Sequence, residues 1–227
     1  MKDTTVSAIE DKQDITTAFL SIADRHPDLK GKQELVEGEA KSLVNIFREA
    51  EIPINHLQQA TAALAHHNAE HQPAQIWVVP AGQGKSTIHA ALTYLFLKNT
   101  DHDIHVVFND DGLKKKDADL NENFIRLCEK AGLDYKKRVK YQTDLKRKSK
   151  TKQTSVMIID ESHARMFKDL YSFHKATKTD EILTICLTAT PFEGEDDGLQ
   201  MTALNEIGYK VYKNSDNNDD YNPQINR

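Results

Sequence analysis

The chain has few of the features that distinguish secreted and membrane proteins. Its only two cysteines, Cys128 and Cys186, lie in segments with regularly spaced apolar residues, so both are expected in the core and no disulfide framework is predicted. The polar N-terminal residues 1–5 contain no apolar leader segment. No apolar run approaches the roughly 18 residues that a membrane span needs. These absences predict a cytoplasmic protein without a membrane span.

Charge is unevenly distributed along the chain. The formal net charge of −5 argues against a protein that coats nucleic acid over its whole surface. Residues 136–152, however, contain nine lysines and arginines and a single acid, Asp144. Such a run can neutralise the phosphates of RNA or DNA, and a solvated loop without a partner is the equally weighted alternative. Within the run, the candidate contacts to nucleic acid are Lys146, Arg147 and Lys148, with Tyr141 available to stack on a base.

A glycine-rich turn at 81–86 lies between an apolar run, 76–79, and a segment with helical spacing of apolar residues, 87–97. Strand, glycine loop and helix in this order predict a phosphate-binding loop, because main-chain N–H groups and the helix N-terminus would face a polyphosphate. Val79 stands in place of the first glycine of the eight-residue pattern, so the prediction depends on its Gly-x-Gly-Lys-Ser end. The predicted nucleotide-binding residues are Ala81, Gly82, Gln83, Gly84, Lys85, Ser86 and Thr87.

Two later apolar segments also end in polar residues. Residues 155–159 lead into Asp160 and Glu161, and residues 182–187 lead into Thr-Ala-Thr-Pro at 188–191. At the carboxyl end of a parallel strand, an aspartate can hold Mg²⁺ and the next glutamate can orient or deprotonate the attacking water. For the first segment alone, a strand ending in solvated acids is the alternative. The order and spacing of all three segments favour a nucleotide site.

Gly-x-Gly-Lys-Ser, then Asp-Glu-x-His, then Thr-Ala-Thr-Pro together resemble the first motor domain of superfamily 2 helicases and translocases, of the DExH type. The resemblance implies a RecA-like fold, with ATP and Mg²⁺ as cofactors. It implies catalytic roles for Glu161 and Lys85, metal binding by Ser86 and Asp160, and coupling of the nucleotide site to movement by His163, Thr188 and Thr190. In this family a glutamine upstream of the phosphate loop often contacts the adenine, and Gln59 in the similar segment 57–62 is the preferred candidate. A glutamine on the solvated face of a helix is the alternative.

The segment 104–118 resembles, over about one supersecondary unit, a stretch of SecA, the preprotein translocase motor. The rest of the chain departs from that family, because SecA has Thr-Gly-Glu-Gly-Lys-Thr in its phosphate loop and Gly-Thr-Ala in place of Ala-Thr-Pro. A protein-translocase type of ATPase is therefore kept as the alternative to a helicase-like one.

Length limits the function that the chain can perform alone. A working motor of this family needs two domains of roughly 150 residues each, and 227 residues leave room for one domain with an N-terminal extension. The family's arginine fingers come from the second domain, and Arg227 is the only arginine after Pro191. Turnover without such a charge is expected to fall on the order of 10³-fold or more. We therefore expect either a second motor domain or protein partner in trans, or a non-hydrolysing, nucleotide-dependent interaction module.

The remaining pattern predicts alternating strands and helices, and hence an α/β fold with a parallel sheet and helices on both faces. Residues 1–54 are expected to form an N-terminal helical extension, 55–213 the ATP-binding domain, and 214–227 a polar, disordered tail. Predicted strands are 75–80, 104–109, 139–141, 155–160, 182–187 and 209–212. Predicted helices are 15–23, 35–50, 56–67, 86–98, 117–131 and 164–175.

Overall fold

The computed structural model describes residues 15–108, 118–143, 145, 155–160, 172–173, 182–189 and 204–214. Its centre is a six-stranded sheet in the order β3-β2-β4-β5-β1-β6, and each neighbouring pair is parallel. The strands are β1 (Ala74–Val78), β2 (Asp103–Val107), β3 (Val139–Gln142), β4 (Ser155–Asp160), β5 (Ile182–Thr188) and β6 (Lys210–Lys213). The predicted α/β fold with a parallel sheet is confirmed.

The central strands are buried on both sides, as their unbroken apolar runs predict. Every residue of β1, β2 and β4 is buried. Parallel strands enclosed on both faces lack the alternation of apolar and polar residues that marks a half-exposed strand. The register sets Ile158 of β4 between Val106 of β2 and Ile185 of β5. All three are β-branched residues with no exposed surface, as is favoured in central strands.

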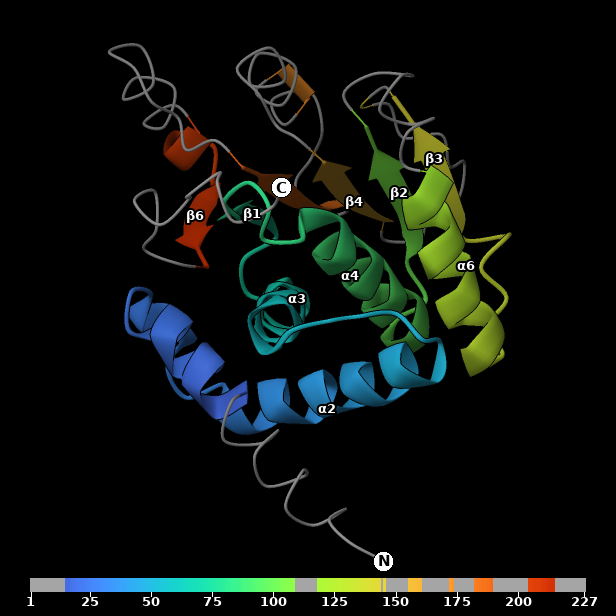
Figure 1. Cartoon of the computed structure of the whole chain (residues 1–227). Helices are drawn as coiled ribbons and strands as arrows, with labels where there is room; N and C mark the ends of the chain where they lie inside the picture. Colours follow the sequence, from blue (N-terminus) through green and yellow to red (C-terminus); the bar gives the residue numbers. More distant parts are fainter. Residues whose placement is uncertain are drawn as a thin grey trace, which may run out of the picture.

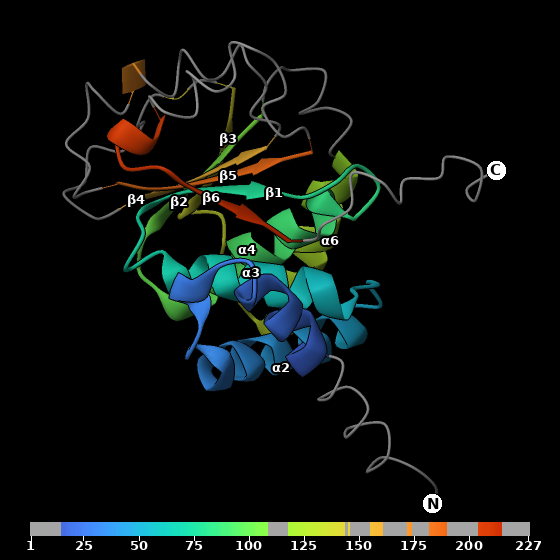
Figure 2. The same ribbon diagram turned by 90° about the vertical axis from the view of Figure 1, so that its left-hand side faces the viewer.

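The helices that precede β3 in the chain form two layers on one face of the sheet, and a short helical segment, 204–206, lies on the other face (Figures 1 and 2). α3 and α4 lie against the strands, and α2 packs on the outer side of α3. The helical elements are residues 15–23, a 3₁₀ turn (Pro27–Leu29), α2 (Gln33–Glu49), α3 (His56–Asn68), α4 (Lys85–Asn99) and α6 (Ala118–Ala131). None of the described helices is long and apolar enough to cross a membrane.

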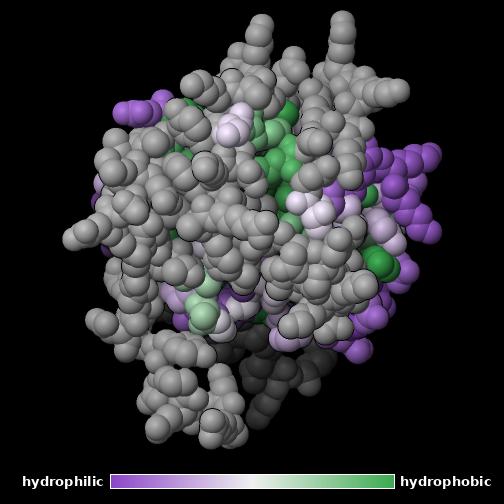
Figure 3. Space-filling view, turned by 90° about the horizontal axis from the view of Figure 1, so that it is seen from above, coloured by the Kyte–Doolittle hydropathy of each residue, from purple (hydrophilic) through white to green (hydrophobic). Residues whose placement is uncertain are grey.

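Apolar residues also gather on the opposite face of the sheet. Seen from that side, an apolar region is visible near the middle of the molecule (Figure 3). A second buried cluster, separate from the main core, includes Val107, Met157, Ile159, Cys186 and Tyr209. The helix predicted at 164–175 lies outside the described residues, except for two helical residues at 172–173. One of these two, Phe173, packs against this second cluster.

The predicted N-terminal extension is helical where it is described, and it shares one core with the sheet. α2 turns a stripe of buried residues inward, Val36, Ala40, Leu43 and Phe47, at the spacing of an amphipathic helix. The same buried cluster contains Trp77 of β1. Burying apolar side chains from both segments in one cluster makes the extension part of the fold that supports the sheet.

Polar contacts join the extension to the edge strand β6. The ring of Tyr212 stacks on Trp77 with the ring centroids 4.7 Å apart. Its hydroxyl accepts a hydrogen bond from Asn68 Nδ2 at 2.8 Å and donates one to Asp28 Oδ2 at 3.1 Å. Lys210 Nζ lies 2.7 Å from the same carboxylate oxygen. Asp28 thus binds two residues of β6 to the turn before α2.

His26 binds the same strand through its main chain. Its Nε2 accepts a hydrogen bond from the Lys213 N–H at 2.8 Å, while the Lys213 carbonyl lies farther away, at 3.3 Å. An imidazole nitrogen can accept only when it carries no proton. Burial lowers the pKa of His26 and the cations Lys210 and Arg25 lower it further, against the opposing effects of the Lys213 main chain and Asp28.

The stability of the protein is therefore expected to fall as the pH drops below about 6.5, the ordinary pKa of histidine. In that range the unfolded chain takes up a proton at His26 before the folded chain does, so acid favours unfolding. His26→Gln retains an acceptor but cannot titrate. Urea unfolding of both proteins between pH 7.5 and 5.0 should show a smaller acid loss in the variant. If the free energy of unfolding falls with pH equally in both proteins, His26 does not cause the loss. The loss would then come from other histidines with lowered pKa that both proteins contain, such as His67 and His102.

Candidate functional site

The three polar strand ends meet at one edge of the sheet. Because the strands are parallel, their carboxyl ends lie together, and β5 separates β1 from β4. The N–H of Val79, just after β1, donates to the carbonyl of Thr188, the last residue of β5, at 2.8 Å. Asp160 ends β4 beside Leu187. The convergence expected from the sequence is thus observed for its described residues.

The turn after β1 has the backbone that its glycines allow. Gly82 and Gly84 have φ of 79° and 74°, in the left-handed region that residues with a side chain rarely adopt. Gly84 is the N-cap of the 15-residue helix α4, and its carbonyl accepts the first helical hydrogen bonds, from Thr87 and Ile88. The positive end of the helix dipole therefore faces the same edge of the sheet, where it would favour an anion.

Lys85 and Asp160 lie close together at this edge. Lys85 Nζ is 3.6 Å from Asp160 Oδ1, and the two side chains are 13% and 9% exposed. Within the described residues, Asp160 Oδ1 accepts no hydrogen bond. A buried carboxylate oxygen that accepts no hydrogen bond and lies 3.6 Å from an ammonium group is poorly satisfied. This arrangement fits Mg²⁺, which prefers carboxylate oxygen, next to a loop that fits a polyphosphate.

Gln58 is the glutamine that contacts the glycine loop after β1. Its Nε2 donates to the Gln83 carbonyl at 3.0 Å. Its Oε1 accepts from the Asn55 N–H at 3.0 Å, and Asn55 in return caps the Gln58 N–H, so the two residues form a capping box at the start of α3. The sequence prediction overlooked Gln58, although Asn-x-x-Gln before an apolar helix is a capping signal. The box and the loop contact together fix the loop to α3.

Gln59, the predicted adenine contact, has a different environment. It is 2% exposed, and its Nε2 donates to the Ile54 carbonyl at 3.3 Å, in the segment before α3. The solvated helix face that was the alternative does not describe it either, because the side chain is buried. Contact with an adenine stays a prediction.

Several predicted site residues lie outside the described part of the chain. They are Glu161, His163, Thr190, Lys146, Arg147 and Lys148. Ala81 and Ser86 are exposed at the loop, and Thr188 is fully buried at the end of β5.

One residue of the basic run has a structural role. The guanidinium of Arg138 donates to the carbonyls of Leu97 at 2.9 Å, of Thr100, and of His102 at 2.9 Å. The carbonyls of Leu97 and Thr100 lie in the last turn and at the C-cap of α4. At this end of a helix cations are favourable, and main-chain carbonyls lack helical donors. Tyr141 is partly buried and stacks on Phe108 with centroids 6.3 Å apart. Arg138 is thus occupied by main-chain contacts, and one face of Tyr141 is covered.

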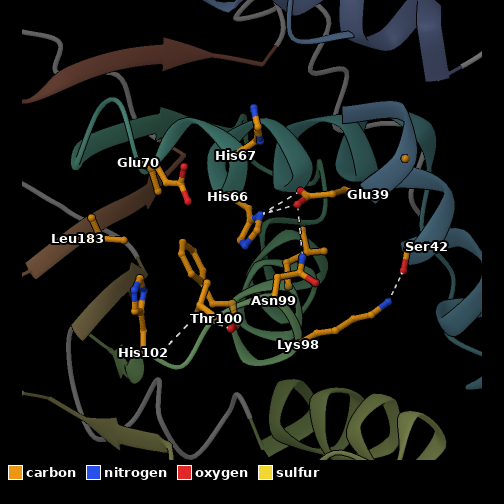
Figure 4. Close-up of a pocket in the computed structure, with 14 residues that line it drawn as sticks. Glu39, Ser42, His66, His67, Glu70, Lys98, Asn99, Thr100, His102 and Leu183 are labelled. Carbon is orange, nitrogen blue, oxygen red and sulfur yellow. Dashed lines mark hydrogen bonds and ion pairs between the residues drawn. The ribbon is translucent and has the colours of Figure 1, made fainter. Parts of the chain in front are cut away.

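A cavity of about 470 Å³ lies at the opposite edge of the sheet. It is lined by residues of α2, of the ends of α3 and α4 and of the starts of two strands, among them Glu39, His66, His102 and Leu183 (Figure 4). His66 Nδ1 is paired with Glu39 at 2.8 Å. No group of three histidine, cysteine or acidic side chains in the described ranges is arranged to hold a metal ion. The cavity is therefore separate from the glycine loop and has no comparable set of phosphate and metal ligands.

Comparison with known proteins supports the fold. No family model matches the chain, and no curated protein matches it. Among solved structures, UvsW of bacteriophage T4 has a TM-score of 0.51 and 19% identity, over 70% of this chain and 34% of that chain. The chain shares its fold with a helicase. A second structure, of the UvsW helicase from the same phage, has a TM-score of 0.49 and 18% identity, over 69% of this chain and 58% of that chain. The chain thus spans about a third to three fifths of these helicase chains.

Contact between the loop and Gln58 gives a prediction for Gly84. A Cβ at Gly84 would lie 2.0 Å from Gln58 Nε2, whereas at Gly132, also at positive φ, it would have nothing within 4 Å. Gly84→Ala and Gly132→Ala should share the backbone strain of about 1–2 kcal/mol. Gly84→Ala should cost a further 0.5–2 kcal/mol or so, because it displaces Gln58 from two hydrogen bonds. Urea unfolding of both variants measures this difference.

The same pair of variants in a Gln58→Ala background provides the control. There the displaced contact is already absent, so the excess cost of Gly84→Ala over Gly132→Ala should shrink to less than about 0.5 kcal/mol. An undiminished excess would show that Gln58 is not the neighbour that limits this position.

Proposed function

We propose that the chain is an ATP- and Mg²⁺-binding motor domain of the superfamily 2 helicase type. The observation that supports this most directly is the buried, incompletely satisfied Asp160 carboxylate beside Lys85, at the mouth of a glycine loop that begins a long helix. Placing a buried acid there costs free energy unless a ligand completes its contacts. The fold shared with a helicase supports the same conclusion.

Each residue near the loop has a distinct role in this proposal. Lys85 binds the β- and γ-phosphates, and Ser86 and Asp160 hold Mg²⁺, which when bound neutralises charge that develops on the phosphates. Glu161 orients the attacking water and takes its proton. Gln59 contacts the adenine. The main-chain N–H groups that bind the phosphates come from Ala81, Gly82, Gln83, Gly84, Lys85, Ser86 and Thr87.

Coupling to movement is assigned to the ends of β4 and β5. The N–H of Val79, the residue between β1 and the loop, donates a hydrogen bond to the Thr188 carbonyl. A shift of the loop on nucleotide binding would therefore be transmitted directly to β5. His163 and Thr190 complete this coupling in the proposal. The hydrogen bond offers a contiguous physical connection of the kind that coupling requires.

RNA or DNA is the proposed partner, and Lys146, Arg147 and Lys148 are its proposed contacts. A second motor domain or protein partner in trans is expected to supply the charge that stabilises the transition state, so that hydrolysis by this chain alone is slow. Arg138, a described cation of the basic run, donates to carbonyls at the end of α4 and is therefore not among the proposed contacts.

Substitution of Lys85 tests ATP binding. Lys85→Ala should weaken Mg²⁺–ATP binding by about tenfold or more, because it removes a charged partner of the phosphates. Lys98→Ala, an exposed lysine at the other end of α4, should have no effect and is the matched control. Isothermal titration calorimetry with each protein measures the affinities. Equal affinity in the wild type and Lys85→Ala would contradict the proposed site.

Glu161→Gln separates binding from hydrolysis in the same preparations. It should retain ATP affinity while lowering steady-state turnover on the order of 10²-fold, as expected for loss of a general base. Binding without turnover in the wild type would instead favour a nucleotide-dependent interaction module.

Substitution of the basic run tests the partner. Single-stranded RNA or DNA should raise ATP turnover or affinity, and replacing Lys146, Arg147 and Lys148 with Gln should remove most of that response and lower its salt dependence. A control that neutralises three exposed lysines elsewhere, Lys30, Lys41 and Lys130, has the same net charge and should retain it. Stimulation by an unfolded polypeptide and not by nucleic acid would favour the protein-translocase alternative.

A further inference from the structure

One buried side chain at the carboxyl edge of the sheet has no role in the function proposed above. Asn214 follows β6 directly and is 1% exposed. Its main-chain N–H donates to the Val78 carbonyl at 3.2 Å, which extends the parallel pairing of β6 with β1 by one residue. Because Val78 ends β1, Asn214 lies beside the strand end that leads into the glycine loop.

The side-chain amide of Asn214 is unsatisfied. Within the described part of the chain, neither its Nδ2 nor its Oδ1 has a hydrogen-bond partner. Asn68, the other asparagine that is buried in the described residues, is 2% exposed and has two partners. It accepts from Lys32 Nζ at 2.6 Å and donates to the Tyr212 hydroxyl at 2.8 Å. A buried amide without partners lowers stability, so the one at Asn214 calls for an explanation, and a bound ligand would provide it.

The order of the strands sets the direction in which a nucleotide would lie across the loop. In the order β4-β5-β1-β6, Asp160 at the end of β4 lies on one side of the glycine loop, and Asn214 lies on the other. Mg²⁺ bridges the β- and γ-phosphates, so the terminal phosphates belong on the Asp160 side of the proposed site. The sugar and base are attached at the opposite end of the phosphate chain and therefore extend toward β6.

We propose that Asn214 binds the edge of the nucleotide base and selects adenine over guanine. This inference rests on the proposed function and adds a specificity-determining residue on β6 to it. The N6 and N7 atoms of adenine present a donor and an acceptor side by side, which match Oδ1 and Nδ2 of an asparagine, whereas the same edge of guanine presents two acceptors. Because Asn214 is 1% exposed, a base that reaches it is shielded from water, so a mismatched edge leaves buried polar atoms unpaired.

Gln59, the adenine contact in the proposed function, is less suited to this selection. Its Nε2 donates to the Ile54 carbonyl at 3.3 Å, and among the described residues only its Oε1 has no partner. Of the two amides, Asn214 is therefore the one that offers both a donor and an acceptor to a base.

Calorimetry with three ligands separates the base from the phosphates. The affinity for Mg²⁺–tripolyphosphate reports the glycine loop and Asp160 without a base. The ratio of the affinities for Mg²⁺–ATP and Mg²⁺–GTP, here called the base selectivity, reports the contact with the base. The wild type should prefer ATP about tenfold, equivalent to about 1.4 kcal/mol.

Asn214→Leu removes the donor and the acceptor but retains a branched side chain of similar shape. It should lower the base selectivity to less than about twofold. Its affinity for Mg²⁺–tripolyphosphate should stay within about twofold of the wild type, because the loop and Asp160 are intact.

Asn68→Leu is the matched control, because it removes a buried amide whose partners are inside the protein. It should lower the thermal unfolding temperature of the ligand-free protein and leave the base selectivity unchanged. Asn214→Leu should do the reverse, since it breaks no hydrogen bond of the described side chains. A fall in unfolding temperature as large as that of Asn68→Leu would overturn the inference, because the Asn214 amide would then already have partners in the free protein, an ordered water included.

The wild-type protein distinguishes failure of the inference from failure of the proposed function. If the wild type binds neither Mg²⁺–ATP nor Mg²⁺–tripolyphosphate, both fail. If the wild type binds them without base selectivity, or if Asn214→Leu retains that selectivity, the inference alone fails. Should Asn214→Leu not fold, Asn214→Ala decides, since it also lacks the donor and the acceptor and adds no volume. Base selectivity retained in Asn214→Ala would then overturn the inference.

Discussion

The parallel pairing of β1, β5 and β4 is the constraint on which the candidate site depends. In parallel strands every carboxyl end lies at the same edge, so a loop after β1 and an acid at the end of β4 are brought together although they are far apart in the chain. The main-chain bond from Val79 to Thr188 extends this pairing past the last residue of β1. Without that register, Lys85 and Asp160 would not meet.

Burial makes unsatisfied polar groups at the site energetically unfavourable. The sheet and the helical layer enclose Asp160 and His89 almost completely, and a buried polar group that lacks partners is unfavourable. Such incompletely satisfied groups are commonly found where a protein binds a ligand or performs chemistry. In the described part of this chain, Asp160 Oδ1 is one such atom, and it lies 3.6 Å from Lys85 in the first turn of α4.

Local patterns in the sequence were sufficient for the elements and for part of the site. Apolar runs that end in polar residues predicted β1, β4 and β5, and the parallel sheet then implied that Lys85 and Asp160 would converge. Gln58 and Gln59 show where this reasoning ends, because adjacent residues of a helix point about 100° apart and only the capping geometry fixes which one faces the loop. The sequence analysis counted Arg138 in the basic run that can neutralise phosphates. No local sequence pattern reveals that main-chain carbonyls 36 to 41 residues away accept hydrogen bonds from its guanidinium.

The bond between Asp28 and Tyr212 joins residues 184 positions apart. A ribosome makes the chain from the N-terminus, so the helical layer can emerge and collapse long before its partner on β6 exists. Until that strand emerges, the stacking surface of Trp77 and the carboxylate of Asp28 lack their native partner. The extension is therefore translated well before β6 but completes its packing only after it, and a nascent chain halted before residue 210 would expose an unpaired edge of β1.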